Sequence, residues 1–265
     1  MTEPSFTEET LSGALCSLAL QAGAAAMQIY ARDFETRFKG DASPVTEADR
    51  IAEEIILAGL TAFAPEIPVL AEESAAAGHI PGSLGRRFFL VDPLDGTREF
   101  VSKTGEFTVN IALIEDGRPV YGVVYAPAID RLYAGGRGGA WAADVKDGEI
   151  GPRTAISARQ APMGGLVAVA SRSHRSPETD DFLNRLTVSD FTAAGSSLKF
   201  CLVAEGKADI YPRFGRTMEW DTAAGQAVLE AAGGRVVIHP GGEPLTYGKK
   251  ARGFDNPHFI AWGLD

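Results

Sequence analysis

Two aspartates placed three residues apart are the first candidates for chemistry in this chain. The stretch VDPLDGT covers residues 91–97 and puts Asp92 and Asp95 directly behind the apolar run 88–91. Two carboxylates about 5 Å apart repel each other by roughly 3 kcal/mol at an effective dielectric of 20. A fold that holds them together must gain something from a cation or a proton between them, so we interpret the pair as a candidate cation site.

Two further acids follow expected element ends in the same way. Glu72 comes after the expected strand 68–71, and Asp221 opens the expected helix 222–232. If both meet the aspartate pair, four negative charges match two divalent ions, and a third ion would leave the site positive for a phosphate. Oxygen ligands favour Mg²⁺, Mn²⁺ or Ca²⁺ over zinc. Taken singly, each acid has an ordinary structural alternative as part of a turn, an exposed edge or a helix N-cap, and for Asp95-Gly96 alone the turn is favoured.

The same turn also offers groups for an anion. Pro93 lacks an N–H group, so we expect the strand to stop there. Gly96 permits unusual backbone angles, and residues 96–100 could begin a helix whose free N–H groups bind phosphate. A divalent metal phosphate needs both carboxylates and amides. The alternative is a plain surface turn, since Asp-Gly pairs are frequent in turns.

The elements that must position these residues fall into two halves. Residues 1–150 are expected to form an α+β lobe. Ser5 with Glu8 predicts the start of a first helix that ends near Phe34, and Thr46 with Asp49 predicts the start of a second. Asp-Gly at 116–117 predicts a hairpin. The expected strands of this lobe cover residues 68–71, 88–91, 106–115, 119–125, 132–134 and 139–142.

Residues 151–265 are expected to form an α/β lobe, because strands and helices alternate there. The polar segment 144–163 marks the expected boundary, and no internal repeat is evident. Strands are expected at residues 165–170, 209–211 and 235–238, and helices at residues 179–186, 196–205 and 222–232.

Composition narrows the class of protein. The chain has 265 residues, 45% of them hydrophobic and 23% charged, which is typical of a globular protein. A net charge of −10 repels nucleic-acid phosphate. Two cysteines far apart in sequence, Cys16 and Cys201, do not suggest a zinc site. The acidic N-terminus does not resemble a signal peptide, and the helical candidate 11–30 is too rich in small and polar residues to be interpreted as a membrane span.

Four motifs, AEES (71–74), LVDPLDGT (90–97), EWDTAAG (219–225) and VTEAD (45–49), resemble the signatures of the inositol monophosphatase superfamily. This superfamily comprises Mg²⁺-dependent, lithium-sensitive phosphatases. A longer series is similar to its CysQ-type 3′(2′),5′-bisphosphate nucleotidase branch along nearly the whole chain: DPLDGTREF, GEFTVNIALI, GVVYAP, SRSH, GSSLKFCLVAEGKADIYPRFG and WDTAAG. The resemblance implies a layered αβαβα sandwich of the fructose-bisphosphatase type.

The resemblance also implies a set of site residues. Two to three Mg²⁺ ions per site would be held by Glu72, Asp92, the main-chain carbonyl of Leu94, Asp95 and Asp221. The catalytic residues would be Glu72 and the water-activating pair Asp49 and Thr97. The substrate would be contacted by Glu72, Leu94, Asp95, Gly96, Thr97, Ser197, Lys199, Arg213 and Asp221.

The implied activity is hydrolysis of 3′-phosphoadenosine 5′-phosphate to AMP and phosphate, within sulfur assimilation. A metal-activated water would attack the 3′-phosphorus in line, a second metal would stabilise the leaving oxygen, and the amides of Gly96 and Thr97 would hold phosphoryl oxygens. Inositol-specific relatives have a glutamate where this chain has Arg213, whose guanidinium suits phosphate instead. A second phosphate on the substrate would explain both Arg213 and Lys199. His174 could contact the nucleotide or have no role.

Several alternatives stay open. The chain could be an inositol-1-phosphate, histidinol phosphate or other small-molecule monophosphatase, or a non-catalytic binding protein on the same fold. We expect a small phosphorylated nucleotide as the partner, no nucleic acid, no transmembrane segment, and a monomer or homodimer. A cytoplasmic location is expected, with peripheral association with the inner membrane suggested by some relatives only. Activity on 3′-phosphoadenosine 5′-phosphosulfate and the roles of Glu73, Arg98 and Lys103 are left open.

Overall fold

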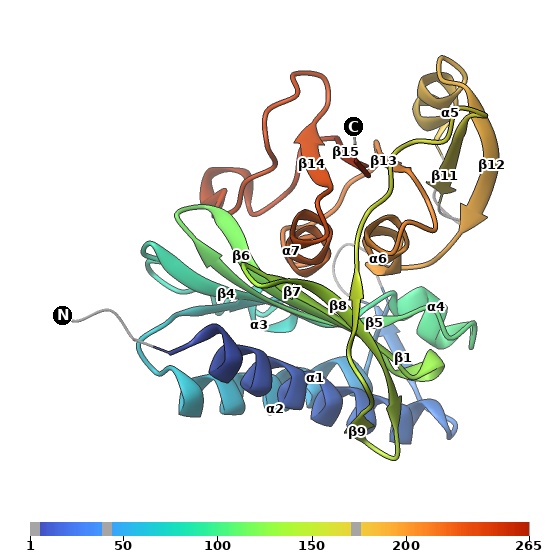
Figure 1. Cartoon of the computed structure of the whole chain (residues 1–265). Helices are drawn as coiled ribbons and strands as arrows, with labels where there is room; N and C mark the ends of the chain where they lie inside the picture. Colours follow the sequence, from blue (N-terminus) through green and yellow to red (C-terminus); the bar gives the residue numbers. More distant parts are fainter. Residues whose placement is uncertain (1–5, 39–43, 171–175, 265) are drawn as a thin grey trace.

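The elements of this chain stack in five alternating layers of helix and sheet (Figure 1). The computed structural model describes residues 6–38, 44–170 and 176–264. From one side to the other, the layers are a helix pair, an eight-stranded sheet, a second helix pair, a five-stranded sheet and one short helix. The helices, in that order, are α1 (Glu8–Tyr30) with α2 (Glu47–Phe63), α6 (Leu198–Ala204) with α7 (Ala223–Ala231), and α5 (Pro177–Leu183). The predicted αβαβα sandwich is therefore confirmed.

The outer helices α1 and α2 begin at side-chain caps. The predicted capping box of α2 is present. The Thr46 side chain accepts from the main-chain N–H group of Asp49, and the Asp49 side chain accepts from the main-chain N–H group of Thr46. Helix α1 uses Thr7 as its N-cap and ends at Tyr30, four residues before the predicted end near Phe34. The predicted cap Ser5 lies outside the described residues.

Helix α1 is the one described helix whose length and composition would suffice to cross a membrane. Half of its most apolar window is buried inside the fold. Leu11, Leu15, Ala19 and Ala22 pack against α2 and the first sheet as part of a hydrophobic core. The apolar character of α1 is thus accounted for by its packing in the outer layer.

The first sheet has the strand order β10-β8-β7-β6-β5-β4-β3, with β9 attached to β8. Its β3 is parallel to β4 and its other pairs are antiparallel. The hairpin predicted at Asp116-Gly117 is confirmed, with φ angles of 49° and 76°. The strands are β3 (Val69–Ala71), β4 (Arg87–Asp95), β5 (Thr108–Glu115), β6 (Arg118–Ala126), β7 (Arg131–Gly136), β8 (Gly139–Lys146), β9 (Glu149–Ile150) and β10 (Thr154–Ile156).

Smaller elements surround this sheet. Strand β1 (Thr36–Phe38) pairs with β2 (Pro44–Thr46) directly before α2. The one-turn helices α3 (Glu72–Ala76) and α4 (Thr97–Val101) follow β3 and β4. Strand β10 pairs with β8, so the first sheet extends past residue 150. The division into two lobes at that residue stays a prediction.

Strand β4 corrects one expectation. It does not stop at Pro93 but continues to Asp95. The pairing with β5 skips the residues between Asp92 and Asp95, which is the irregularity of a bulge. Inside it the Leu94 N–H group donates to Asp92 Oδ1 at 3.0 Å. A proline fits there because no ladder hydrogen bond is required of it.

The second sheet has the order β12-β11-β13-β15-β14. The first three strands are parallel, whereas β15 runs antiparallel to both of its neighbours. Strands β12 and β15 were not predicted. The strands are β11 (Leu166–Ala170), β12 (Val188–Ala193), β13 (Ile210–Arg213), β14 (Arg235–Ile238) and β15 (Phe259–Trp262).

Helix α7 packs unusually close to the first sheet. A Cβ atom added at Gly122 on β6 would lie 2.5 Å from the carbonyl oxygen of Ala224, and one at Gly135 on β7 would lie 2.8 Å from Val228 Cα. Glycines therefore allow the helix backbone to rest on the strands. Asp221 stands two residues before this helix, so the contact fixes the height of Asp221 above the sheet.

Candidate active site

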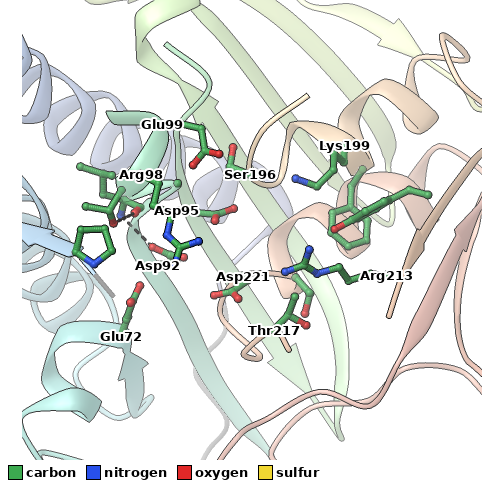
Figure 2. Close-up of a pocket in the computed structure, with 17 residues that line it drawn as sticks. Glu72, Asp92, Asp95, Arg98, Glu99, Ser196, Lys199, Arg213, Thr217 and Asp221 are labelled. Atoms are coloured by element: carbon green, nitrogen blue, oxygen red, sulfur yellow. Dashed lines mark hydrogen bonds between the residues drawn. The ribbon is translucent and has the colours of Figure 1, made fainter. Parts of the chain in front are cut away.

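A cavity of about 250 Å³ opens where β4 ends, between the first sheet and the second helix pair. Figure 2 shows Lys199 and Arg213 on one side of it and the carboxylates, with Arg98 beside Asp92 and Asp95, on the other. It is lined by Pro44, Glu72, Asp92, Leu94, Asp95, Gly96, Thr97, Arg98, Glu99, Ser196, Lys199, Phe200, Tyr211, Arg213, Thr217, Asp221 and Thr222.

The four acids that the sequence predicted to converge all line this cavity. Glu72 begins α3, Asp92 and Asp95 stand on either side of the β4 bulge, and Asp221 precedes α7. Figure 2 shows their carboxylates facing a common space. Asp92 is only 1% exposed, so this charge cannot be dispersed into solvent. The predicted convergence is confirmed.

Their proximity changes how readily these acids lose a proton. Burial raises the pKa of Asp92 well above its usual range, and the charges of Glu72, Asp95 and Asp221 raise it further. Burial and the charges of Asp95 and Glu72 do the same to the pKa of Asp221. Burial raises the pKa of Asp95 to about 6, against the lowering effect of Lys199. These shifts arise first from burial and, for Asp92 and Asp221, also from the charges of the neighbouring acids.

In Asp95 and Asp221, one of the two carboxylate oxygens accepts hydrogen bonds from described residues. Asp95 Oδ2 accepts from the Ser197 hydroxyl at 3.0 Å, and Asp221 Oδ2 accepts from the Met218 N–H group at 2.9 Å. Among the described residues, no hydrogen bond reaches Oδ1 of Asp95 or Oδ1 of Asp221. One oxygen of each acid is thus held by the protein while the other is left as a donor for a cation.

The fit to a metal can be tested on this donor set. Within residues 6–38, 44–170 and 176–264, no three Asp, Glu, His or Cys side chains are arranged to hold one ion by themselves. Mg²⁺ does not require that, because it commonly binds one or two carboxylates and completes its shell with water and phosphate oxygens. Oxygen donors without thiolate or imidazole, together with the raised pKa values of Asp92 and Asp221, fit such an ion. The individual metal ligands stay a prediction.

The predicted pair Asp49 and Thr97 is brought together at the edge of the cavity. The Thr97 hydroxyl lies 3.1 Å from Asp49 Oδ1 and 3.4 Å from the Leu94 carbonyl oxygen. Asp49 Oδ2 accepts from the N–H group and the hydroxyl of Thr46, each at 2.8 Å. Asp49 is 1% exposed. The geometry confirms that the two residues meet, while their role in activating water stays a prediction.

The opposite side of the cavity is cationic. Lys199 is 6% exposed, and its Nζ lies 5.5 Å from the centre of the Tyr211 ring. Burial lowers the pKa of Lys199 to about 8, although the charge of Asp95 raises it. Arg213 donates through Nη2 to the Arg216 carbonyl oxygen at 3.1 Å, and its buried Nε has no hydrogen-bond partner among the described residues. Both cations therefore retain donors for an anion.

Some predicted residues lie elsewhere. Ser197 is 1% exposed and lies behind Asp95, while its neighbour Ser196 lines the cavity. Its hydroxyl hydrogen-bonds with Asn110, Asp95 and the Asp221 carbonyl oxygen, and the predicted contact of Ser197 with substrate stays a prediction. Lys103 is outside the lining residues and donates to the Tyr30 carbonyl oxygen. His174 lies outside the described residues.

Two buried acids that the sequence analysis did not single out support the site. Glu53, 4% exposed, accepts from the Glu73 and Ser74 N–H groups at 2.7 Å each, directly after Glu72. Glu219 is fully buried and holds the main chain at residues 248–249. The available signal for Glu53 was its position on α2, one turn after Asp49, where both side chains face the same way.

The layered fold and the acidic cavity define a class of phosphatase, and comparison with known proteins agrees. The family model for the inositol monophosphatase family matches residues 7–259, and the chain belongs to that family of metal-dependent phosphatases.

The chain is similar to the 3′(2′),5′-bisphosphate nucleotidase CysQ of Salmonella typhimurium, at 49% identity over 92% of this chain and 96% of that protein. It is 47% identical to CysQ of Escherichia coli K12 over the same shares. Among solved structures, CysQ from Bacteroides thetaiotaomicron matches with a TM-score of 0.78 and 40% identity, covering 96% of this chain and 98% of that one.

Proposed function

We propose that this chain hydrolyses the 3′-phosphate of 3′-phosphoadenosine 5′-phosphate, releasing AMP and phosphate. The observation that carries the proposal is one cavity with an acidic wall, formed by Glu72, Asp92, Asp95 and Asp221, and a cationic wall, formed by Lys199 and Arg213. A substrate with two phosphates suits both walls, because one phosphate would share metal ions with the carboxylates and the other would meet Lys199 and Arg213. The nucleotidase names of the similar proteins support the same substrate.

The acidic wall is proposed to hold Mg²⁺, two or three ions per site. Its ligands would be the carboxylates of Glu72, Asp92, Asp95 and Asp221 and the Leu94 carbonyl oxygen. When bound, the metal would supply a water of lowered pKa and polarise the phosphoryl oxygens. Asp95 and Asp221 each keep one carboxylate oxygen without a described hydrogen bond, which is the donor arrangement that such ions need.

The proton is handled by Asp49 and Thr97. The Thr97 hydroxyl donates to Asp49 Oδ1 at 3.1 Å, so its own lone pairs face an incoming water and orient it toward the phosphorus. Asp49 then receives the proton through this hydroxyl. The main-chain N–H groups of Gly96 and Thr97 stabilise the charge on the phosphoryl oxygens.

The cationic wall selects the second phosphate. Lys199 offers an ammonium group that is buried beside the Tyr211 ring, and Arg213 offers a guanidinium whose Nε is unpaired among the described residues. A guanidinium donates to phosphate oxygens but cannot accept from sugar hydroxyls. This donor set therefore favours a bisphosphate over an inositol monophosphate.

A substrate panel tests the proposal. Phosphate release from 3′-phosphoadenosine 5′-phosphate, inositol 1-phosphate and histidinol phosphate is measured with and without Mg²⁺. We expect the nucleotide to have the highest kcat/KM and all turnover to require the metal. Asp95→Asn, checked for an intact fold, should abolish release. Faster turnover of inositol 1-phosphate would replace the proposed substrate, and metal-independent release would reject the mechanism.

A second candidate is an inositol monophosphatase, because an inositol monophosphatase of Thermotoga maritima matches with a TM-score of 0.76 at 26% identity. Arg213→Glu separates the two. On the proposed function it should reduce kcat/KM for the bisphosphate by at least about tenfold more than for a small monophosphate. Equal losses on both substrates would remove Arg213 from substrate selection. A binding protein without catalysis would release no phosphate from any member of the panel. Oligomeric state and location in the cell stay predictions.

A further inference from the structure

The hydroxyl of Ser197 is the centre of a buried contact between four segments of the chain. It accepts from Asn110 Nδ2 at 3.0 Å. It also lies 3.0 Å from Asp95 Oδ2 and 2.8 Å from the main-chain oxygen of Asp221. Ser197 and Asn110 are each 1% exposed. The contact joins the start of α6, strand β5, the end of β4 and the segment before α7.

The chemistry of this contact is directional. A serine hydroxyl has one proton, which it shares here between the two acceptors, the Asp95 carboxylate and the Asp221 carbonyl. Asn110 occupies a lone pair of the hydroxyl and also lies 3.5 Å from Asp95 Oδ2. The Asn110 Oδ1 atom is buried and has no hydrogen-bond partner among the described residues. The side chain of Asn110 is therefore used for its N–H donors and not for its oxygen.

This arrangement decides which oxygen of Asp95 is available. Both described hydrogen bonds reach Oδ2, so the carboxylate plane is fixed with Oδ1 as the remaining donor. The same hydroxyl holds the main chain of Asp221, whose Oδ2 is held by Met218. One hydroxyl thus sets the position of two of the proposed metal ligands relative to each other.

We propose that Ser197 and Asn110 are positioning residues that hold Asp95 and Asp221 at the separation needed for a divalent cation. The inference rests on the proposed function, since it concerns the same acidic wall. Groups that hydrogen-bond to metal ligands typically contribute 10–100-fold to metal affinity. Neither residue touches the substrate in this role, and Ser197 acts through the two acids.

Metal binding to the substrate-free protein tests this directly. Mn²⁺ is titrated into the whole chain, and free Mn²⁺ is measured by electron paramagnetic resonance. Ser197→Ala removes the hydroxyl, whereas Ser197→Cys fills the same space with a weak donor. We expect both variants to bind Mn²⁺ at least about tenfold more weakly than the wild type. Ser12→Ala is the matched control, because Ser12 is a buried serine on α1 outside the cavity, and it should bind like the wild type.

A double variant adds a second criterion. Asn110→Ala should weaken binding as Ser197→Ala does, and the pair together should lose less than the product of the two losses, because both act through one contact. Wild-type Mn²⁺ affinity in Ser197→Ala or in Ser197→Cys would overturn the inference, as would fully multiplicative losses. Absence of Mn²⁺ binding to the wild type would instead reject the proposed function.

Discussion

At the scale of single residues, Asp49 has two tasks that use different oxygens of one carboxylate. Its Oδ2 completes the capping box of α2 with Thr46, and its Oδ1 accepts from Thr97 at the cavity. In the sequence, the spacing places Asp49 at the start of α2, and the family resemblance assigns it to catalysis. The structure shows that the cap does not exclude the second task, because a carboxylate can accept at both oxygens.

Thr97 is the cleaner residue on which to test proton handling, because it is not part of the α2 cap. Thr97→Ala removes the hydroxyl between the water and Asp49, and we expect kcat to fall by about 10² or more with KM nearly unchanged. Thr97→Ser keeps the hydroxyl and should retain activity within about tenfold. Steady-state kinetics at saturating Mg²⁺ measure both. A Thr97→Ala variant with normal kcat would contradict the role.

The acidic cluster also predicts how stability depends on pH. Burial raises the pKa of Asp95 from 3.8 to about 6, so the folded state binds this proton more tightly than the unfolded state. The metal-free protein should therefore lose stability as pH rises from about 4 to 6, by on the order of 3 kcal/mol from Asp95 alone. The raised pKa values of Asp92 and Asp221 extend the loss toward higher pH.

Thermal unfolding with EDTA or Mg²⁺ at pH 5 and pH 8 measures this linkage. Mg²⁺ should raise the melting temperature more at pH 8 than at pH 5. At pH 5 protons compete with the ion for the carboxylates, whereas at pH 8 this competition is weaker. Asp95→Asn should flatten part of the pH dependence in EDTA. A Mg²⁺ effect that is equal at both pH values would show that these carboxylates do not bind the ion.

At the scale of elements, helix α2 connects two sides of the site. It carries Asp49 in its first turn and Glu53 one turn later, about 6 Å along the axis. Glu53 accepts from the Ser74 hydroxyl at 2.6 Å and from two N–H groups of α3. A buried glutamate thereby holds the turn that begins with Glu72, at a fixed distance from Asp49.

Removal of the Glu53 carboxylate, which caps N–H groups in the first turn of α3, should affect both stability and activity. Glu53→Ala leaves two N–H groups of α3 without their acceptor, and we expect the free energy of unfolding to fall by roughly 2–4 kcal/mol. The apparent Mg²⁺ requirement should rise because Glu72 is no longer held. Denaturant unfolding and Mg²⁺ titration of activity measure the two effects.

The neighbouring residue provides a matched control for the α3 cap. Glu54 is on the same helix, and among the described residues its exposed side chain pairs with Arg50 one turn before it. Glu54→Ala should change stability by less than about 0.5 kcal/mol. Similar losses in both variants would mean that Glu53 acts only as a surface charge of α2.

The elements also show how far local sequence patterns reach. The α2 cap and the 116–117 hairpin were predictable because their signals are contacts between near neighbours in sequence. The passage of β4 through Pro93 was not, because it depends on a bulge that only pairing with β5 creates. Strand β12 is an exposed edge with little alternation of polarity, so no pattern marks it.

The candidate site was predictable to the same degree. The four acids followed from their motifs, since each stands at or near an element end, Asp92 at the bulge of β4, where a side chain can reach a shared cavity. The residues that hold these acids in place could not be predicted from the motifs. Glu53 and Asn110 look like ordinary residues of an amphipathic helix and of an alternating strand. Their importance comes from contacts with residues 20 and 87 positions away, which local patterns do not report.

At the scale of the whole molecule, the layers meet so closely that packing far from the cavity should affect it. Gly122→Ala would place a Cβ atom 2.5 Å from the Ala224 carbonyl oxygen and push α7 away from the sheet. We expect a loss of roughly 1–3 kcal/mol in unfolding free energy, together with a raised Mg²⁺ requirement because Asp221 moves with α7.

A glycine without neighbours is the control for this layer contact. Gly13 is in the interior of α1, and a Cβ atom there would meet nothing within 4 Å. Gly13→Ala should leave the Mg²⁺ requirement unchanged and stabilise the protein by up to about 1 kcal/mol, because alanine favours helix. Denaturant unfolding and Mg²⁺ titration of both variants decide the matter. Unchanged stability in Gly122→Ala would show that α7 can shift freely.

The two walls of the cavity come from different stretches of the chain. Four of its five acidic lining residues precede residue 100, whereas Lys199 and Arg213 lie near each other in the second half. On the proposed function, the distance between these walls selects substrates by the separation of their two anionic groups. Selection would then depend on how far apart a molecule carries its two anionic ends, and the group between them would matter mainly as a spacer.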